Sequence, residues 1–144
     1  MLSIDNYTPE YVTKCRSRVA EQVSAYQTLL AAARKRTSDG SQLDSAIAAF
    51  EPHFLNNMVL ALDILFVHRA RGLERKDGNP LNEVRLLCES IMNHDGAMCA
   101  DDTIKIDPAK SVLKYRVGDR INLNVADFIL LSSCFFAEIE EKYL

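Results

Sequence analysis

The chain has 144 residues, of which 48% are apolar and 26% charged, and its formal net charge is -3. This length corresponds to one domain with a sizeable core, and the balance of apolar and charged residues excludes a disordered or collagen-like chain. The overall charge of a weakly acidic protein does not attract nucleic acid or an anionic membrane, so we expect neither as a partner. We therefore expect a single helical domain over residues 1–144.

The cysteines and the start of the chain indicate a cytosolic protein. Residues 1–8 are polar and lack the apolar stretch of a secretory signal peptide. The longest apolar run, residues 58–67, has about half of the roughly 20 residues that span a bilayer, so we expect no membrane anchor. No two cysteines form a Cys-x-x-Cys pair, which favours reduced thiols; they are Cys15, Cys88, Cys99 and Cys134.

The first predicted element is a long helix over residues 9–36. Thr8 is a suitable N-cap, and Pro9 suits the first helical position. The basic residues at positions 34–36 complement the negative end of the helix, and Gly40 follows as a stop. Apolar residues recur every three or four positions along one face: Val12, Cys15, Val19, Val23, Tyr26, Leu30 and Ala33.

Two helices are expected between residues 41 and 71. A short helix begins at Ser41, and Pro52 either kinks it or starts a new helix. The second helix, residues 53–71, is apolar nearly all round at its middle, and such a helix belongs at the centre of a bundle. Gly72 ends this helix, and a turn follows over residues 74–80.

Two more helices and an irregular region make up the second half of the chain. Asn79 is the expected cap of a helix that starts at Pro80, and Asn124 caps the last helix, residues 125–144. Residues 103–106 and 120–123 alternate and are β-branched, which predicts two short strands. We therefore expect a mainly α fold: a bundle of four long helices and one short helix, with a two-strand β-ribbon before the last helix.

A metal centre is the first chemistry to test, because helical bundles often hold one. Neither Glu-x-x-His nor His-Glu-x-x-His occurs, and His53, His68 and His94 are far apart in the sequence. We expect no metal and no cofactor, although three histidines from separate helices can still converge.

A polar arc on the central helix is the main candidate for a ligand pocket. His53 and Asn57 are one helical turn apart, so their side chains can meet. Asp63 lies where desolvation is costly unless the carboxylate is paired. With His68, these residues form a pocket, a buried structural network or simply the outer face of the helix, and we favour either of the last two over a pocket.

A basic turn between the central helix and the next one is the second candidate. Its cations are Arg69, Arg71, Arg75 and Lys76, and they precede a helix N-terminus, where anions bind. The simpler interpretation is that two of them cap their own helix and two pair with neighbouring acidic residues. No glycine-rich phosphate loop supports an anion site.

The last helix carries more apolar side chains than one core needs, among them Phe135, Phe136 and Ile139. Two-fold dimers are the commonest oligomers, and a terminal helix is well placed to form one. We therefore expect a cytosolic interaction protein, leaning to a non-enzymatic one, that acts as a homodimer through this helix. Two alternatives remain open: a small-molecule-binding or metal-dependent enzyme that uses the polar arc, and a weak anion or nucleic-acid binder that uses the turn 69–76.

Overall fold

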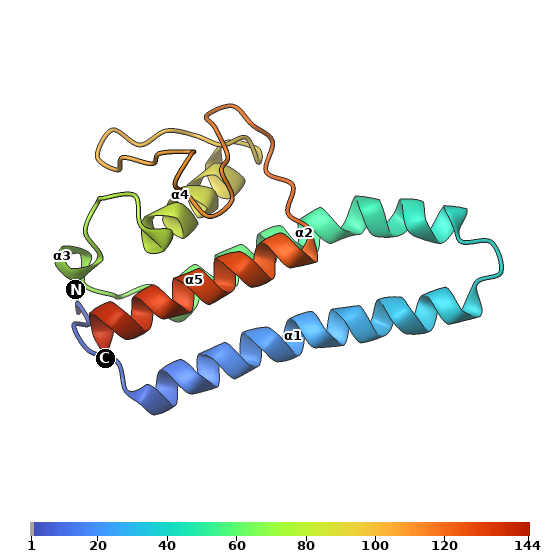
Figure 1. Ribbon diagram of the computed structural model, residues 1–144, viewed down its shortest axis with the longest axis horizontal. Coiled ribbons are helices and arrows are strands. Elements are labelled where there is room, and N and C mark those ends of the chain that lie inside the picture. Colours follow the sequence, from blue (N-terminus) through green and yellow to red (C-terminus); the bar gives the residue numbers. More distant parts are fainter. Residues whose placement is uncertain (1) are drawn as a thin grey trace.

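The computed structural model describes residues 2–144 and confirms the mainly α class. Five helices account for most of the chain, and Figure 1 shows their arrangement. In chain order they are α1 (Pro9–Arg36), α2 (Ser41–Leu65), α3 (Arg71–Glu74), α4 (Pro80–Asn93) and α5 (Val125–Tyr143). No helix in the described part of the chain is both long enough and apolar enough to cross a membrane.

Helix α1 has the bounds that its sequence predicts. The Thr8 side chain accepts a hydrogen bond from the Tyr11 amide at 3.1 Å, so it is the N-cap, and Pro9 occupies the first turn. Arg34, with the two basic residues after it, lies in the last turn, as expected for cations at the negative end of a helix.

Helix α2 differs from the two helices expected between residues 41 and 71. It runs continuously through Pro52, whose missing N–H costs the helix one internal hydrogen bond. It ends at Leu65 and not at residue 71, because the backbone that follows pairs with the N-terminal segment. Ile4 donates its N–H to the His68 carbonyl at 2.8 Å and accepts the Ala70 N–H at 2.9 Å.

Gly72 does not end a helix, as the sequence suggested, but lies inside the four-residue helix α3. Helices α4 and α5, by contrast, begin as predicted. The Asn79 side chain accepts the Leu81 and Asn82 amides at 2.9 and 3.2 Å. Asn124 and Asp127 form a reciprocal capping box at the start of α5.

The predicted β-ribbon is wrong: residues 2–144 contain isolated bridges but no strand. Residues 118–121 bond to residues 96–98 and not to residues 103–106, as shown by the 2.8 Å hydrogen bond from the Ile121 amide to the Gly96 carbonyl. The alternating pattern has another cause. Ile104, Ile121 and Leu123 are all buried, and the loop lays Ile121 and Leu123 onto the helical core.

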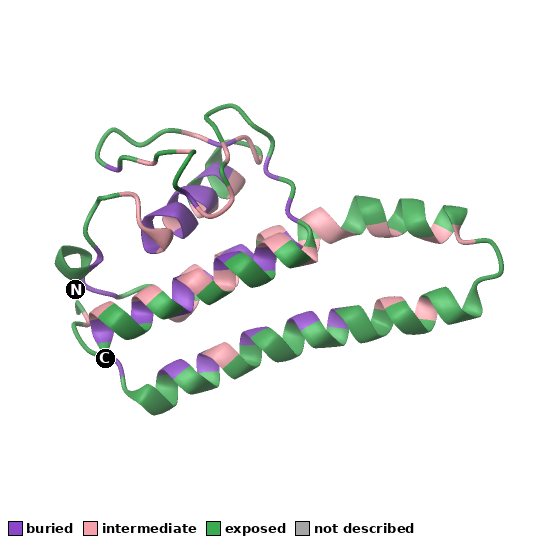
Figure 2. Ribbon diagram, in the orientation of Figure 1, coloured by how far each residue is buried: buried purple, intermediate pink, exposed green. Residues whose placement is uncertain are grey.

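The core forms where α4 and α5 cover the second half of α2 and the first half of α1 (Figures 1 and 2). The aromatic residues expected to make α5 too apolar for one subunit are buried in this core. Phe128, Phe135 and Phe136 are all at most 1% exposed. Much of the apolar surface of α5 is therefore covered within the same chain.

The remaining halves of α1 and α2 project beyond this core as a two-helix arm, which we define as residues 27–50. The arm extends to the right in Figure 1, and Figure 2 shows it exposed or half-buried throughout. No residue from 27 to 50 is buried. The two helices of the arm thus have no third helix or loop packed over them.

Candidate functional site

A polar groove of about 710 Å³ lies where α2, the end of α4 and residues 120–122 meet. Two residues of the predicted polar arc, His53 and Asn57, line it together. Asn56 lies beside them on the same helix. No sequence pattern predicts that Asp95, Arg120 and Asn122 also lie here, since they come from distant segments.

The far wall of the polar groove is held by a tight turn after α4. Asp95 and Gly96 both adopt positive φ angles, of 52° and 78°. The Arg120 Nη1 atom donates to the Asp95 carbonyl oxygen at 2.9 Å, which fixes the guanidinium at the edge of the groove. Residues 96 and 121 are joined by a backbone hydrogen bond, so the arginine is carried on an anchored segment.

Most polar side chains of the groove make no hydrogen bond to the rest of the described chain. His53, Asn57 and Asn122 have none through their side chains, and Arg120 makes only the bond to Asp95. The Asn56 Oδ1 atom is buried and without a partner. An asparagine amide offers two donors and one acceptor, so the groove is rich in unused hydrogen-bonding capacity.

The other two residues of the predicted arc lie elsewhere. Asp63 Oδ1 is 2.9 Å from Arg69 Nη1, although the two groups are not aligned for a hydrogen bond. His68 is exposed beyond the end of α2, beside Tyr7 and Tyr11. The structure therefore brings His53 and Asn57 together and places Asp63 and His68 outside the groove.

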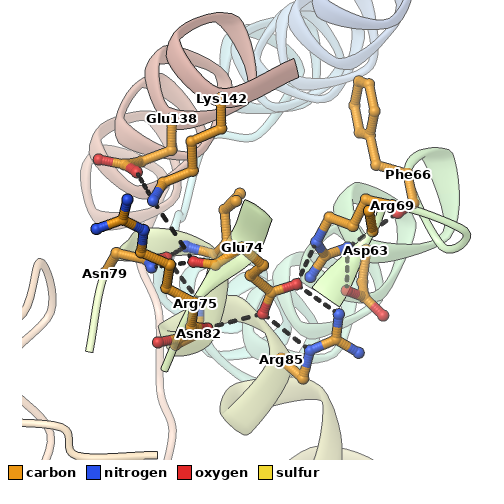
Figure 3. Close-up of polar contacts among 12 residues, drawn as sticks. Asp63, Phe66, Arg69, Glu74, Arg75, Asn79, Asn82, Arg85, Glu138 and Lys142 are labelled. Atoms are coloured by element: carbon orange, nitrogen blue, oxygen red, sulfur yellow. Dashed lines mark hydrogen bonds and ion pairs between the residues drawn. The ribbon is translucent and has the colours of Figure 1, made fainter. Parts of the chain in front are cut away.

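Asp63 belongs to a buried ionic network centred on Glu74 (Figure 3). The Glu74 and Arg69 side chains are both 0% exposed, and Arg69 Nε donates to Glu74 Oε1 at 2.7 Å. Arg85 donates to both Glu74 oxygens, at 2.6 and 3.0 Å, and the Asn82 amide donates at 3.0 Å. This network joins the end of α2, helix α3 and helix α4.

The Glu74 carboxylate stays ionised in this buried position. Burial raises its pKa, but the hydrogen bond from Arg85 and the positive charges of Arg69 and Arg85 outweigh burial and hold the pKa below its usual value. With every oxygen already bonded to the chain, Glu74 has no capacity left for a substrate. The network therefore has the character of a structural clamp.

The three histidines occupy three different places. His53 is in the groove, His68 follows α2, and His94 caps the end of α4, with Nε2 3.9 Å from Glu89 Oε1. Over residues 2–144, no cluster of three or more histidine, cysteine or acidic side chains is placed to hold a metal ion.

The four cations of the predicted basic turn are likewise separated. Arg69 is buried in the ionic network, whereas Arg71, Arg75 and Lys76 are exposed. Arg75 shares a second surface pocket, of about 530 Å³, with the acidic residues Glu138 and Glu141 of α5. Arg75 thus faces the acidic end of the chain, which weakens its attraction for an external anion.

The Cys88 thiol offers little chemistry. All four cysteines are free. Burial raises the pKa of the Cys88 thiol to about 12, so this thiol is protonated at neutral pH and is a poor nucleophile.

Glu83, which the sequence did not single out, anchors the long loop before α5. Its side chain lies on α4 and is buried, and it accepts the Val112 and Leu113 amides at 2.8 and 2.9 Å. Burial raises the pKa of this carboxyl more than the two amides lower it. A glutamate is unremarkable in a helix, so only the tertiary structure reveals this role.

Replacing Glu83 with alanine is expected to loosen the loop while the helices persist. The variant leaves two backbone N–H groups without an acceptor, and each unpaired buried group costs about 1–3 kcal/mol. We expect amide hydrogen exchange to quicken at Val112 and Leu113, as measured by NMR, with helical circular dichroism retained. Unchanged exchange at both amides would show that the glutamate does not anchor the loop; Glu89→Ala, on the exposed side of α4, is the control.

Comparisons of this chain with protein-family models, curated protein sequences and solved structures give no match. The geometry of the chain itself is therefore the basis for assigning a function.

Proposed function

We propose that this chain is a cytosolic, non-enzymatic interaction protein that acts as a homodimer, with the arm as its contact surface. The observation that carries the proposal is the absence of any buried residue from 27 to 50. Helical segments of about ten residues are marginal in water by themselves, because most helix stability comes from packing an apolar face. A second copy of the arm would supply the missing cover.

The apolar stripes of the arm have the spacing of a helix-packing seam. On α2, Leu43, Ile47 and Phe50 are separated by four and three residues, and on α1 Leu29 follows Tyr26 by three residues. Leu29 and Phe50 nevertheless remain 64% and 53% exposed. Side chains in seam positions that stay this exposed support an interface with another helical surface.

The charges of the arm favour a second copy as the occupant. Its three cations, residues 34–36, are all on α1, and its two acidic residues, Asp39 and Asp44, lie on the connecting turn and on α2. Arg34 Nε lies 3.9 Å from Asp44 Oδ1 in the same chain, and the other charges of the arm are available to a second copy. In a two-fold pair that sets α1 of one arm against α2 of the other, opposite charges face each other twice. The arm therefore has a surface complementary to itself.

The last helix contributes less to the proposed contact than its composition suggested. Its aromatic residues are used in the core of the same chain, but Ile129 and Leu130 are 50% and 52% exposed. A dimer through α5 is thus a separate form of the proposal, and a substitution on α5 distinguishes it from a dimer through the arm.

The two other functions drawn from the sequence have less support. An enzyme that used the whole polar arc would need Asp63 and His68 in the groove, and an anion binder would need the cations of the turn on one surface.

The double variant Leu29→Ser, Phe50→Ser tests the arm. Each buried apolar side chain contributes about 1.5 kcal/mol, and a two-fold dimer buries both residues in each copy. Removing these four side chains should therefore weaken the dimer by about 10,000-fold. Light scattering and sedimentation at micromolar protein are expected to give a dimer for the natural chain and a monomer for the double variant. Circular dichroism of the variant should lose no more helix than the arm contains, because the core helices pack within one chain.

Two control variants make this result specific. Ile64→Ser removes an equally exposed apolar side chain from α2 outside the arm and should leave the dimer intact. Leu130→Ser should also leave it intact, whereas dissociation by this change alone would place the contact on α5. A natural chain that is monomeric at these concentrations would overturn the homodimer.

A further inference from the structure

We propose that the polar groove binds a free amino acid with an uncharged polar side chain. The groove has the size of a small-molecule site, and its polar groups converge from three separate segments. It does not depend on the arm contact, because His53, Asn56 and Pro52 lie on a different side of α2 from the stripe through Leu43 and Ile47.

The charges at the edge of the groove match a zwitterion. Arg120 and Asp95 both line it, and the Arg120 Nη1 atom is 2.9 Å from the Asp95 carbonyl oxygen, so the two residues are adjacent. A free amino acid carries its carboxylate and ammonium on one carbon and therefore needs an adjacent cation and anion. One guanidinium donor is used on Asp95, which leaves the others free for a forked contact with a carboxylate.

Neither charge is neutralised by another part of the chain. The Arg120 side chain makes no ion pair within residues 2–144, and neither does the Asp95 carboxylate. Both side chains are exposed, and a ligand with a single charge would pair with only one of them. A zwitterion offers a partner to each.

The rest of the groove determines which side chain the ligand carries. His53, Asn57 and Asn122 present imidazole and amide groups whose hydrogen bonds are unused by the described chain. These groups donate and accept, so they suit a hydroxyl or carboxamide better than a charged group. Pro52 and Ile91 add apolar surface against which the carbon chain of such a ligand can lie.

The experiment is a titration of the ¹⁵N-labelled full chain, followed by NMR, with glutamine, asparagine, serine and threonine at millimolar concentration. We expect at least one of them to shift the amides of Gly96, Ile121 and Asn122 in a saturable way. If none of the four does so, the proposal fails.

Matched compounds test the chemistry of recognition. For glutamine, N-acetylglutamine lacks the ammonium, 4-aminobutanamide lacks the carboxylate and norvaline lacks the side-chain amide. Each loss should weaken binding about tenfold or more, because a hydrogen bond to a charged or buried polar group is lost. If N-acetylglutamine and 4-aminobutanamide both bound as tightly as glutamine, the groove would recognise the carboxamide and not the paired charges, which would overturn the zwitterion.

Variants tie the binding to the groove. Arg120→Gln and Asn57→Ala should each weaken binding about tenfold, and Arg116→Gln, an exposed arginine of the same loop that does not line the groove, should not. Circular dichroism and the NMR spectrum of the free variants show whether the fold persists. If Asn57→Ala keeps its fold and binds as the natural chain does, the site is not this groove. Since the arm variants leave the groove residues in place, loss of the dimer and loss of ligand binding are separate results.

Discussion

Replacing Glu74 with alanine is expected to lower the free energy of unfolding by about 3–5 kcal/mol, because it leaves buried positive charge uncompensated. Arg69 is fully buried, and its Nη2 atom already has no hydrogen-bond partner among the described residues. Without Glu74, Arg69 keeps only the partly exposed Asp63 as a counter-ion. Urea denaturation of the variant and of the natural chain measures the difference.

Two controls separate the buried charge from the loss of a side chain. Glu141→Ala removes an exposed glutamate from α5 and should change stability by no more than about 0.5 kcal/mol. The double variant Arg69→Met, Glu74→Leu removes both charges and should recover much of the loss, since a buried ion pair can often be replaced by apolar residues. A loss below about 1 kcal/mol for Glu74→Ala would mean that Arg69 is not confined as the structure has it.

The same network makes stability depend on pH in a defined direction. The folded pKa of Glu74 is lower than its unfolded value, so the folded state binds fewer protons there. The resulting stabilisation is complete above the ordinary glutamate pKa of about 4.3 and is lost as the pH falls through the lower folded value. The Glu74→Gln variant should lack the part of the acid-induced fall in the free energy of unfolding that is due to this carboxylate.

Local signals in the sequence predicted the starts of α1, α4 and α5 and the end of α1, but not the end of α2. Thr8, Asn79 and Asn124 each bond to amides in the first turn that follows them, so a short sequence contains everything that the cap requires. The end of α2 depends on Ile4, more than 60 residues away, whose backbone pairs with residues 68 and 70. No local pattern carries that information.

The partner of Asp63 could not be found from the sequence for the same reason. A buried carboxylate there requires a cation, and Arg69 is only six residues on. In a helix continuing to residue 71, positions 63 and 69 would point about 120° apart and could not meet. Because α2 ends at Leu65, the chain turns and brings the two side chains within 2.9 Å.

The groove shows the same division between local and distant information. His53 and Asn57 share a helical face through spacing alone, and the sequence predicted their proximity. Arg120 and Asn122 were expected in a strand, and their place in the groove depends on the hydrogen bond between residues 96 and 121.

Phe66→Ala is expected to cost about 3–5 kcal/mol, the range for removing a large buried aromatic side chain. Phe66 is 0% exposed and lies at the end of α2, where four rings surround it. Their centroids lie 5.0 to 5.9 Å from its own, and they belong to Tyr7, Tyr11, Phe135 and Phe136. One side chain thus joins the N-terminal segment, α1, α2 and α5.

The loss should spread beyond the cavity, because Phe66 also lies between the aromatic cluster and the ionic network. Its carbonyl accepts a hydrogen bond from Arg69 Nη1 at 3.1 Å, and the backbone after it pairs with Ile4. In the variant we expect faster amide exchange at Ile4 and Ala70, together with a lower urea midpoint. Met92→Ala, which truncates a side chain that is 65% exposed, should show neither change. If Phe66→Ala destabilised the chain but left exchange at Ile4 and Ala70 unaltered, the N-terminal segment would be held independently of this aromatic cluster.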